Sequence, residues 1–251
     1  MNENSVTAIV PAAGLGSRAA TADGLPKQYR RLAGEAMLRR TVRALLAEPR
    51  VAQVRVAVSP GDVWVEDTLA GLPRTLWRPC GGLTRADTVR AALCDAALPR
   101  TAWVMVHDAA RPGLPRAALA RLIDTCLQYG RGGLLALPVA DTVKLAAEDG
   151  AGAPAVARTL ARDGLWLAQT PQMFRAGALL DALIASAGDA RVTDEASAME
   201  LAAATDAPLL VRGARANEKL TWPEDFQWFE RTLDARLDPL AGLGDREDDG
   251  S

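Results

Sequence analysis

Three lysines stand out in this chain because arginine fills nearly every other cationic position. The 251 residues include 29 basic ones, of which only Lys27, Lys144 and Lys219 are lysine. Each lies in a short polar cluster that we interpret as a strand-to-helix loop. A lysine ammonium is a compact point charge on a flexible stem, and arginine's planar fork is not its equivalent at a phosphate. These lysines are therefore candidates for phosphate chemistry, with chance retention on a solvated surface as the alternative.

A loop rich in small residues and cations follows the first predicted strand. It begins Pro11-Ala12-Ala13-Gly14-Leu15-Gly16 and continues through Arg18 to Lys27. Small residues let the backbone approach a ligand, and successive amides suit an anion. The third glycine of the dinucleotide motif is absent, and so is the G-x-x-x-x-G-K-[ST] motif. A bare G-x-G more often marks a structural turn, so the case for an anion site rests on the two cations.

A carboxylate follows another apolar run, residues 103–106. Asp108 lies where a charge is costly unless it is paired or holds a metal. An ion pair with Arg111 is one interpretation, and a role in binding a ligand is the other. His107, the only histidine, is interpreted as a hydrogen-bonded structural group without a chemical role.

The sequence offers no residues for proton abstraction or covalent catalysis. No Ser-His-Asp set, activated cysteine or zinc-ligand spacing can be assembled. Cations with one carboxylate suit a reaction that needs charge stabilisation, such as phosphoryl or nucleotidyl transfer. An attacking phosphate needs no base at neutral pH, because its second pKa is about 6.

Short aliphatic runs alternate with helical patterns, which predicts an α/β fold with a mostly parallel sheet covered on both faces. The predicted strands are residues 8–10, 54–59, 103–106, 134–139 and 209–212. The predicted helices are residues 37–46, 85–98, 115–129, 177–187, 194–204 and about 222–237. Thr221 and Glu224 are expected to form a capping box at the last helix. Ligands of such sheets bind beyond the carboxyl ends of the strands, where the loops above would lie.

Two segments break the alternation. Residues 141–162 hold β-like stretches around a centre of turn residues, which predicts a hairpin arm that needs another surface to lie on. Residues 241–251 are glycine-rich and then acidic, and we expect a disordered tail. This leaves a single domain over residues 1–240.

Composition indicates a cytoplasmic protein. Residues 1–7 carry no secretory signal, and no apolar stretch approaches the length of a membrane span. Cys80, Cys94 and Cys126 form no C-x-x-C pair and are typical of reduced cysteines. A formal charge of −2 argues against a nucleic-acid partner.

Seven motifs in series resemble the 2-C-methyl-D-erythritol 4-phosphate cytidylyltransferase family, from about residue 6 to 237. Each motif is modest alone, but the ordered series is very specific. In order, they are Val10–Arg18 with Pro26–Tyr29; Gly81-Gly82 with Arg85, Thr88 and Val89; His107–Pro112; Asp141–Lys144; Gln169–Gln172; Thr193–Ser197; and Asn217–Lys219 with Pro223–Asp225.

The resemblance implies a Rossmann-like, GT-A-like nucleotidyltransferase fold, a three-layer sandwich with a protruding β-arm for dimerisation. The implied enzyme joins CTP to methylerythritol phosphate and releases pyrophosphate, in the non-mevalonate route to isoprenoid precursors. It is expected to work as a homodimer with Mg²⁺.

The resemblance also implies roles for individual positions. Arg18 and Lys27 match the catalytic cations that stabilise the pentacoordinate α-phosphate. The nucleotide-binding positions are Pro11, Ala12, Ala13, Gly14, Gly16, Gly81, Gly82, Arg85 and Thr88, with Thr88 in place of the more usual serine. The positions around the sugar phosphate are Asp108, Arg111, Thr142, Arg162, Thr170, Thr193 and Lys219. Asp108 is also a candidate Mg²⁺ ligand, directly or through water, and Arg162 is expected to reach the partner subunit's site.

Three alternatives stay open at this point. A cytidylyltransferase for another polyol phosphate, such as ribitol 5-phosphate, shares most of these motifs. A dinucleotide-dependent oxidoreductase is disfavoured by the missing third glycine and acidic ribose partner. A non-catalytic nucleotide-binding regulator would bind CTP without releasing pyrophosphate.

Overall fold

The computed structural model of this chain describes residues 4–14, 24–148, 153–202 and 207–237. Two of the predicted site residues, Gly16 and Arg18, lie outside these ranges, as does the predicted acidic tail. The single domain over residues 1–240 stays a prediction.

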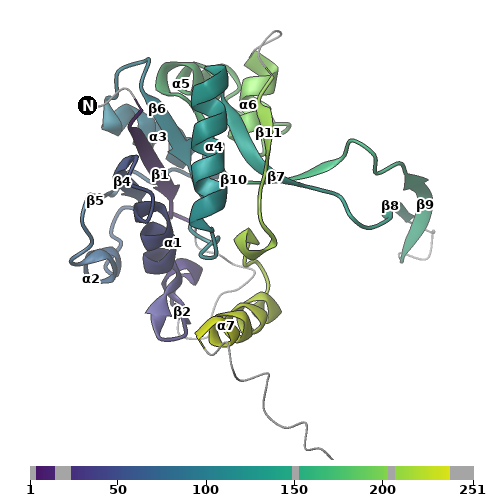
Figure 1. Cartoon of the computed structure of the whole chain (residues 1–251), viewed down its shortest axis with the longest axis horizontal. Helices are drawn as coiled ribbons and strands as arrows, with labels where there is room; N and C mark the ends of the chain where they lie inside the picture. Colours follow the sequence, from purple (N-terminus) through teal and green to yellow (C-terminus); the bar gives the residue numbers. More distant parts are fainter. Residues whose placement is uncertain (1–3, 15–23, 149–152, 203–206, 238–251) are drawn as a thin grey trace, which may run out of the picture.

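A seven-stranded sheet forms the centre of the molecule, in the order β11-β7-β10-β6-β1-β4-β5 (Figure 1). Neighbouring strands run parallel except β10, which is antiparallel to both β6 and β7. The predicted α/β fold with a mostly parallel sheet is therefore confirmed. The strands are β1 (Val6–Pro11), β4 (Val51–Ala57), β5 (Thr75–Arg78), β6 (Trp103–Val106), β7 (Gly133–Pro138), β10 (Trp166–Arg175) and β11 (Leu209–Arg212).

Helices cover both faces of the sheet, because alternate residues of each strand point to opposite sides. On β1, Ala8 packs in the cluster that includes α1 and α4, whereas Ile9 packs in the one that includes α3, α5 and α6. The result is the expected three-layer sandwich. The helices are α1 (Met37–Leu46), α2 (Val65–Leu69), α3 (Arg85–Ala96), α4 (Arg116–Tyr129), α5 (Ala176–Ala185), α6 (Glu195–Ala202) and α7 (Pro223–Leu237). Shorter elements are the 3-10 turns η2 (Lys27–Tyr29) and η3 (Arg215–Asn217) and the hairpin β2 (Arg31–Leu32) and β3 (Glu35–Ala36).

Strand β10 is the main element that the sequence pattern did not predict. Its pairing with β7 shifts register between Ala168 and Gln172, around the Thr170-Pro171 step. Proline donates no ladder hydrogen bond and is tolerated in sheets at such irregularities. The interruption hides the alternation that would otherwise mark a central strand.

Two local predictions are wrong. Lys144 lies within an arm strand rather than in a strand-to-helix loop, and its Nζ donates to Thr159 Oγ1 across the hairpin at 2.7 Å. At the start of α7 the capping carboxylate is Asp225, which accepts the N–H groups of Thr221 and Trp222 at 2.6 and 2.7 Å. The helix begins at Pro223, one residue later than the capping box with Glu224 required.

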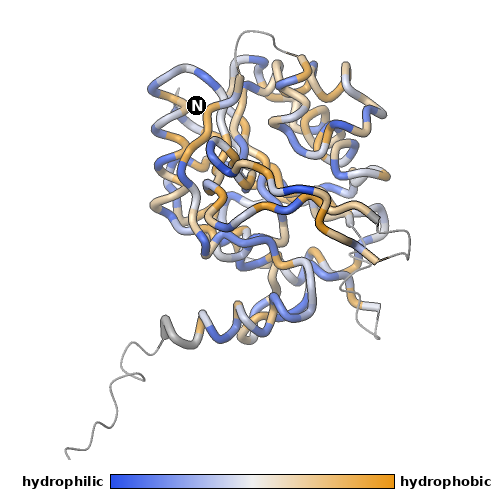
Figure 2. Tube along the Cα trace, turned by 90° about the vertical axis from the view of Figure 1, so that its right-hand side faces the viewer, coloured by the Kyte–Doolittle hydropathy of each residue, from blue (hydrophilic) through white to orange (hydrophobic). Residues whose placement is uncertain are grey.

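The predicted arm is a separate two-stranded sheet that projects from the body (Figure 1). Strands β8 (Val143–Glu148) and β9 (Pro154–Leu160) pair antiparallel, and the predicted turn between them lies outside the described residues. Apolar stretches run along the arm in Figure 2. Leu145 and Val156 are 42% and 64% exposed there. A two-stranded sheet with exposed apolar side chains is marginal without a further surface.

Among the described residues, no helix is both long enough and apolar enough to cross a membrane.

Candidate active site

Two small-residue loops touch beyond the carboxyl ends of β1 and β5. Ala12, Ala13 and Gly14 leave β1 at Pro11, while Gly81 and Gly82 lie between β5 and α3. A Cβ at Gly81 would come 2.2 Å from the Cβ of Ala13, so no larger residue fits there. The structure thus brings together the two stretches that were predicted to bind the nucleotide.

Thr88, in the first turn of α3, supports the Gly81-Gly82 loop. Its hydroxyl accepts the N–H of Gly82 at 3.0 Å and donates to the carbonyl of Thr84 at 3.0 Å, and only 2% of the residue is exposed. A serine hydroxyl could make the same two bonds. Thr88 therefore holds the backbone that would face the nucleotide.

Lys27 opens the turn η2, which packs against the first of these loops. The next residue, Gln28, donates its side-chain amide to the carbonyl of Ala12 at 2.7 Å. The backbone of Lys27 is consequently held beside Ala12–Gly14, and its role as a phosphate-binding cation stays a prediction. Its predicted catalytic partner Arg18 lies outside the described residues.

Asp108 is the centre of a cationic cluster beyond β6. Its Oδ1 accepts from Arg85 Nε at 2.8 Å, and its Oδ2 lies 3.0 Å from Lys219 Nζ and 3.5 Å from Arg111 Nε. The ion pair with Arg111, one of the two interpretations of Asp108, is present but is the longest of the three contacts. Strands β1 and β6 are parallel neighbours, with Ile9 opposite Val106, so this cluster and the Ala12–Gly14 loop emerge at one edge of the sheet.

Glu195 is a further member of the cluster, and its role could not be recognised from the sequence motifs. Its carboxylate, 1% exposed, takes both terminal nitrogens of Arg85 at 2.7 and 3.0 Å. Arg85 was predicted as a nucleotide position, yet its guanidinium joins Glu195 to Asp108. The three cations (Arg85, Arg111, Lys219) and two carboxylates leave the cluster with a net charge of +1 (3 − 2).

Burial and charge act in opposite directions on the pKa values in this cluster, and at Glu195 burial outweighs Arg85 and raises the pKa. Burial alone would raise the pKa of Asp108, but Arg85, Lys219 and Arg111 outweigh it and hold the pKa well below its usual range. Burial alone would lower the pKa of Arg85, and the carboxylates of Glu195 and Asp108 reverse that. Asp108 is therefore ionised and unsuited to act as a base at neutral pH.

A buried polar network supports Asp108 from the neighbouring strand. The Thr170 hydroxyl accepts the N–H of Asp108 at 3.0 Å and lies 2.9 Å from His107 Nδ1, and His107 Nε2 lies 3.2 Å from the carbonyl of Arg111. Because a carbonyl only accepts, Nε2 carries the proton and Nδ1 accepts from Thr170. Asn217 completes the network by donating to the carbonyl of Thr170 at 2.7 Å.

His107 is a structural group, as predicted. The ring is fully buried, and desolvation lowers its pKa to about 4 although Asp108 and two backbone contacts act in the opposite direction. It is neutral at pH 7 and makes two hydrogen bonds inside the protein. Nothing in its surroundings makes it a catalytic base.

Acid should destabilise the protein through His107. Between pH 6.5 and 4 the unfolded chain binds a proton at this residue and the folded chain does not, so stability falls as pH falls. We expect a loss of about 3 kcal/mol over this window, the equivalent of the pKa difference. Urea unfolding at several pH values measures it. A His107→Gln variant should lose less unfolding free energy over the same pH range. If its unfolding free energy fell with pH as steeply as that of the wild type, the assignment to His107 would be contradicted.

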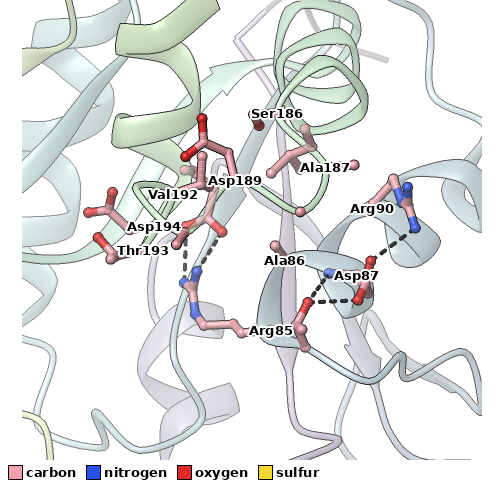
Figure 3. A pocket seen from close by; sticks show the side chains of 15 residues that line it. Arg85, Ala86, Asp87, Arg90, Ser186, Ala187, Asp189, Val192, Thr193 and Asp194 are labelled. Atoms are coloured by element: carbon pink, nitrogen blue, oxygen red, sulfur yellow. Dashed lines mark hydrogen bonds and ion pairs between the residues drawn. The ribbon is translucent and has the colours of Figure 1, made fainter.

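A cavity of about 360 Å³ lies beside the cluster, between the start of α3 and the loop before α6. Figure 3 shows Arg85 reaching from α3 toward the loop that carries Thr193 and Asp194. Asp194 and Ser197 fix this loop, because Asp194 Oδ1 accepts the N–H of Ser197 and Ser197 Oγ accepts the N–H of Thr193. The structure therefore places the predicted residue Thr193 in the same cavity as Arg85.

Known proteins match nearly the whole chain. The sequence profile of the family described as IspD, 2-C-methyl-D-erythritol 4-phosphate cytidylyltransferase, matches residues 6–235. The chain belongs to this family.

Relatives and solved structures agree with this membership. Enzymes named 2-C-methyl-D-erythritol 4-phosphate cytidylyltransferase are 65% identical in Bordetella pertussis, over 91% of this chain and 99% of the relative, and 52% identical in Laribacter hongkongensis, over 87% and 92%. A crystal structure of 4-diphosphocytidyl-2C-methyl-D-erythritol synthase is 38% identical with a TM-score of 0.77, covering 92% of this chain and 98% of the other. The cytidylyltransferase of Thermus thermophilus is 29% identical with a TM-score of 0.73, covering 92% and 99%.

Two of the predicted acceptor positions of this cytidylyltransferase family member lie on the arm. Thr142 precedes β8, and Arg162 follows β9 and donates to the carbonyl of Ala140 at the arm's base. Within the part of the chain that the structure describes, neither has a hydrogen bond or ion pair to the Asp108 cluster. The contacts within the described residues of one copy therefore do not link these two positions to the other predicted acceptor positions.

The described residues do not form a protein cage for a metal ion. No three His, Cys, Asp or Glu side chains among them gather at one point. Both oxygens of Asp108 face cations, which is unfavourable for direct coordination of a further one. The role of Asp108 as a metal ligand stays a prediction that this geometry does not favour.

Proposed function

We propose that the sheet edge formed by β1, β6 and β10 is the active site for cytidylyl transfer, with CTP on the two small-residue loops and the acceptor at the Asp108 cluster. The family transfers the cytidylyl group of CTP to 2-C-methyl-D-erythritol 4-phosphate in isoprenoid precursor synthesis, and this chain is such an enzyme. One observation supports the placement above others. Ala12–Gly14, the Lys27 turn and Asp108 all leave the sheet on the side where α/β proteins bind ligands.

The transfer is a substitution at phosphorus. An oxygen of the acceptor's phosphate attacks the α-phosphorus of CTP, a new P–O bond forms, and the bond to the β-phosphate breaks to release pyrophosphate. The acceptor's phosphate is mostly a dianion at neutral pH and needs no base. The enzyme's tasks are to align two anions and to neutralise the charge of the pentacoordinate state.

The cations divide this work between them. We assign Lys27 and Arg18 to the triphosphate, because Lys27 is held at the loop where the phosphates would lie. The +1 cluster of Arg85, Arg111 and Lys219 with its two carboxylates attracts the acceptor's phosphate and offers Asp108 as an acceptor for a polyol hydroxyl. Lys219, 45% exposed at its side chain, is the cluster's accessible cation.

Mg²⁺ is the divalent ion that we propose for this reaction. Magnesium in nucleotide enzymes is bound largely by substrate phosphates and water, with few side chains. Because the described residues offer no cage, the ion would enter with the triphosphate rather than on Asp108. When bound, it would neutralise part of the charge on the phosphate oxygens.

The arm is the proposed dimer contact. Its exposed apolar side chains need a second surface, and within the described residues of one copy neither Thr142 nor Arg162 bonds to the Asp108 cluster. A dimer in which the arm lies on the partner would bring Arg162 to the partner subunit's acceptor site. We also propose a cytoplasmic location, in line with the three free cysteines.

Mixed dimers test whether the arm acts in trans. An Arg162→Ala chain and a Lys27→Ala chain, each nearly inactive alone, should regain activity when dimers are mixed, because one site then has both residues. Pyrophosphate release from subunit-exchanged samples measures this, and sedimentation confirms that mixed dimers form. Confirmed mixed dimers without recovered activity would place Arg162 outside the partner's site.

Turnover with a panel of acceptors tests the function itself. CTP and Mg²⁺ are supplied with methylerythritol phosphate or ribitol 5-phosphate, and pyrophosphate is scored. We expect methylerythritol phosphate to have the higher kcat/KM. A preference for ribitol 5-phosphate would replace the acceptor in this proposal, and CTP binding without pyrophosphate release would support a regulator instead.

A further inference from the structure

We propose that Gln28 is a positioning residue that fixes the catalytic lysine to the nucleotide loop. The inference rests on the proposed role of Lys27. Gln28 lies inside the Pro26–Tyr29 motif, but neither the motif nor the family assignment gives it a role. The inference derives from one buried hydrogen bond between two parts of the site.

The bond joins segments far apart in the chain. Gln28 Nε2 donates to the carbonyl of Ala12 at 2.7 Å, and Gln28 is 7% exposed. Lys27 and Gln28 are neighbours in η2, a turn closed by the bonds from Tyr29 N–H to the Pro26 carbonyl and from Arg30 N–H to the Lys27 carbonyl, at 2.9 and 3.1 Å. A shift of the Gln28 backbone would therefore carry Lys27 with it.

The same bond orients the loop. In a trans peptide the carbonyl of one residue and the N–H of the next point in opposite directions. The carbonyl of Ala12 faces Gln28, and the carbonyl of Ala13 faces Ser59, whose Oγ donates to it at 2.8 Å. The N–H groups of Ala13 and Gly14 consequently face away from these side chains. Successive backbone amides turned away from the protein's own side chains suit a phosphate.

A second contact anchors the turn from another direction. Tyr29, 4% exposed, donates its hydroxyl to Asp62 Oδ2 at 2.6 Å. The other oxygen of Asp62 accepts the N–H groups of Trp64 and Val65 at 3.0 Å each, at the start of α2. Burial, and then Asp62, raise the pKa of Tyr29, so the hydroxyl keeps its proton. The lysine turn is thus held between the loop after β1 and the segment after β4.

Gln28 therefore couples the cation to the amides around one phosphate group. If Lys27 and the loop moved independently, the ammonium would meet the developing charge only part of the time. Misplacement of a catalytic group by about 1 Å can lower a rate by about 100-fold. Because Gln28 affects the rate only by positioning Lys27, its contribution to the rate should vanish when Lys27 is replaced by a residue without an ammonium group.

A double-mutant cycle on the full chain tests this coupling. Gln28→Met keeps the side chain's length and removes the donor. We expect its kcat to fall by about tenfold or more, with the KM for CTP changed far less. In a Lys27→Ala background the same substitution should change kcat by no more than about twofold, because the residue it positions is gone. A full additional loss in that background would overturn the proposal and show a general structural role.

Two further variants sharpen the result. Ser59→Ala removes the hydrogen bond to the carbonyl of Ala13, the next carbonyl of the same loop, and leaves η2 unchanged. It should raise the KM for CTP more than it lowers kcat. A kcat loss equal to that of Gln28→Met would overturn the proposal. Tyr29→Phe is combined with Lys27→Ala in the same way, so that a test remains if Gln28→Met does not fold. Without Lys27, the Tyr29→Phe substitution should also leave kcat unchanged. A normal kcat in Lys27→Ala alone would instead reject the proposed function.

Discussion

Replacing Lys27 with alanine is expected to lower kcat by about 100- to 1,000-fold while CTP affinity changes by no more than about threefold. The charge that Lys27 meets is greatest when the α-phosphorus is pentacoordinate, and an interaction made mainly in that state lowers kcat rather than ground-state binding. The Gln28 side chain anchors the turn that carries Lys27 beside Ala12, and this supports the expectation, since a cation on a fixed turn needs little reorganisation during the reaction.

Steady-state pyrophosphate release gives kcat, and calorimetric titration gives the affinity for CTP. Arg100→Ala is the matched control. It removes one positive charge from an exposed pair with Asp181, on the segment that leads into β6 at the edge opposite the site, and should leave kcat unchanged. Lys27→Arg should recover only part of the rate, because a guanidinium places its charge differently. A wild-type kcat in Lys27→Ala would remove this residue from the mechanism.

Much of the fold could be predicted because its signals are local. The helix at Met37–Leu46 matches its predicted bounds, and so do the strands at Trp103–Val106 and Leu209–Arg212. Apolar periodicity marks such elements directly. Strand β10 escaped because Pro171 interrupts it and because its antiparallel place is set by neighbours far away in sequence. The edge strand β5 has no fully buried residue and carries little apolar pattern.

The site divides along the same line. Lys27, Asp108 and the glycines could be found because unusual residue types follow apolar strands. Glu195 and Gln28 could not, although each lies inside a quoted motif, because their importance depends on burial and on partners 110 and 16 residues away. A buried carboxylate or amide is distinguished from an exposed one only by tertiary contacts. The orientation of Arg85 toward Glu195 and Asp108 could not be predicted for the same reason.

Replacing Asp108 with asparagine should give the largest loss of stability, about 3–5 kcal/mol. The substitution keeps the shape of the side chain and removes the negative charge that faces Arg85, Arg111 and Lys219. The Nε of Arg111 has no hydrogen-bond partner in the described residues. Because Arg111 is mostly buried, water cannot readily replace the charge of Asp108 beside it. The cluster's net charge rises from +1 to +2, and the buried cations repel one another more strongly.

Urea unfolding of both proteins at pH 7 measures this loss, which corresponds to a Tm roughly 10 °C lower. Asp181→Asn is the control, since its pair with Arg100 is exposed and should contribute no more than about 1 kcal/mol. The pKa of Asp108 is lowered by folding, so its contribution is complete above about pH 4 and disappears as pH falls further. The stability difference between wild type and Asp108→Asn should therefore narrow in strong acid. A difference at pH 7 no larger than that of Asp181→Asn would mean that the buried cations do not depend on Asp108, and the acceptor site proposed around it would lose its electrostatic basis.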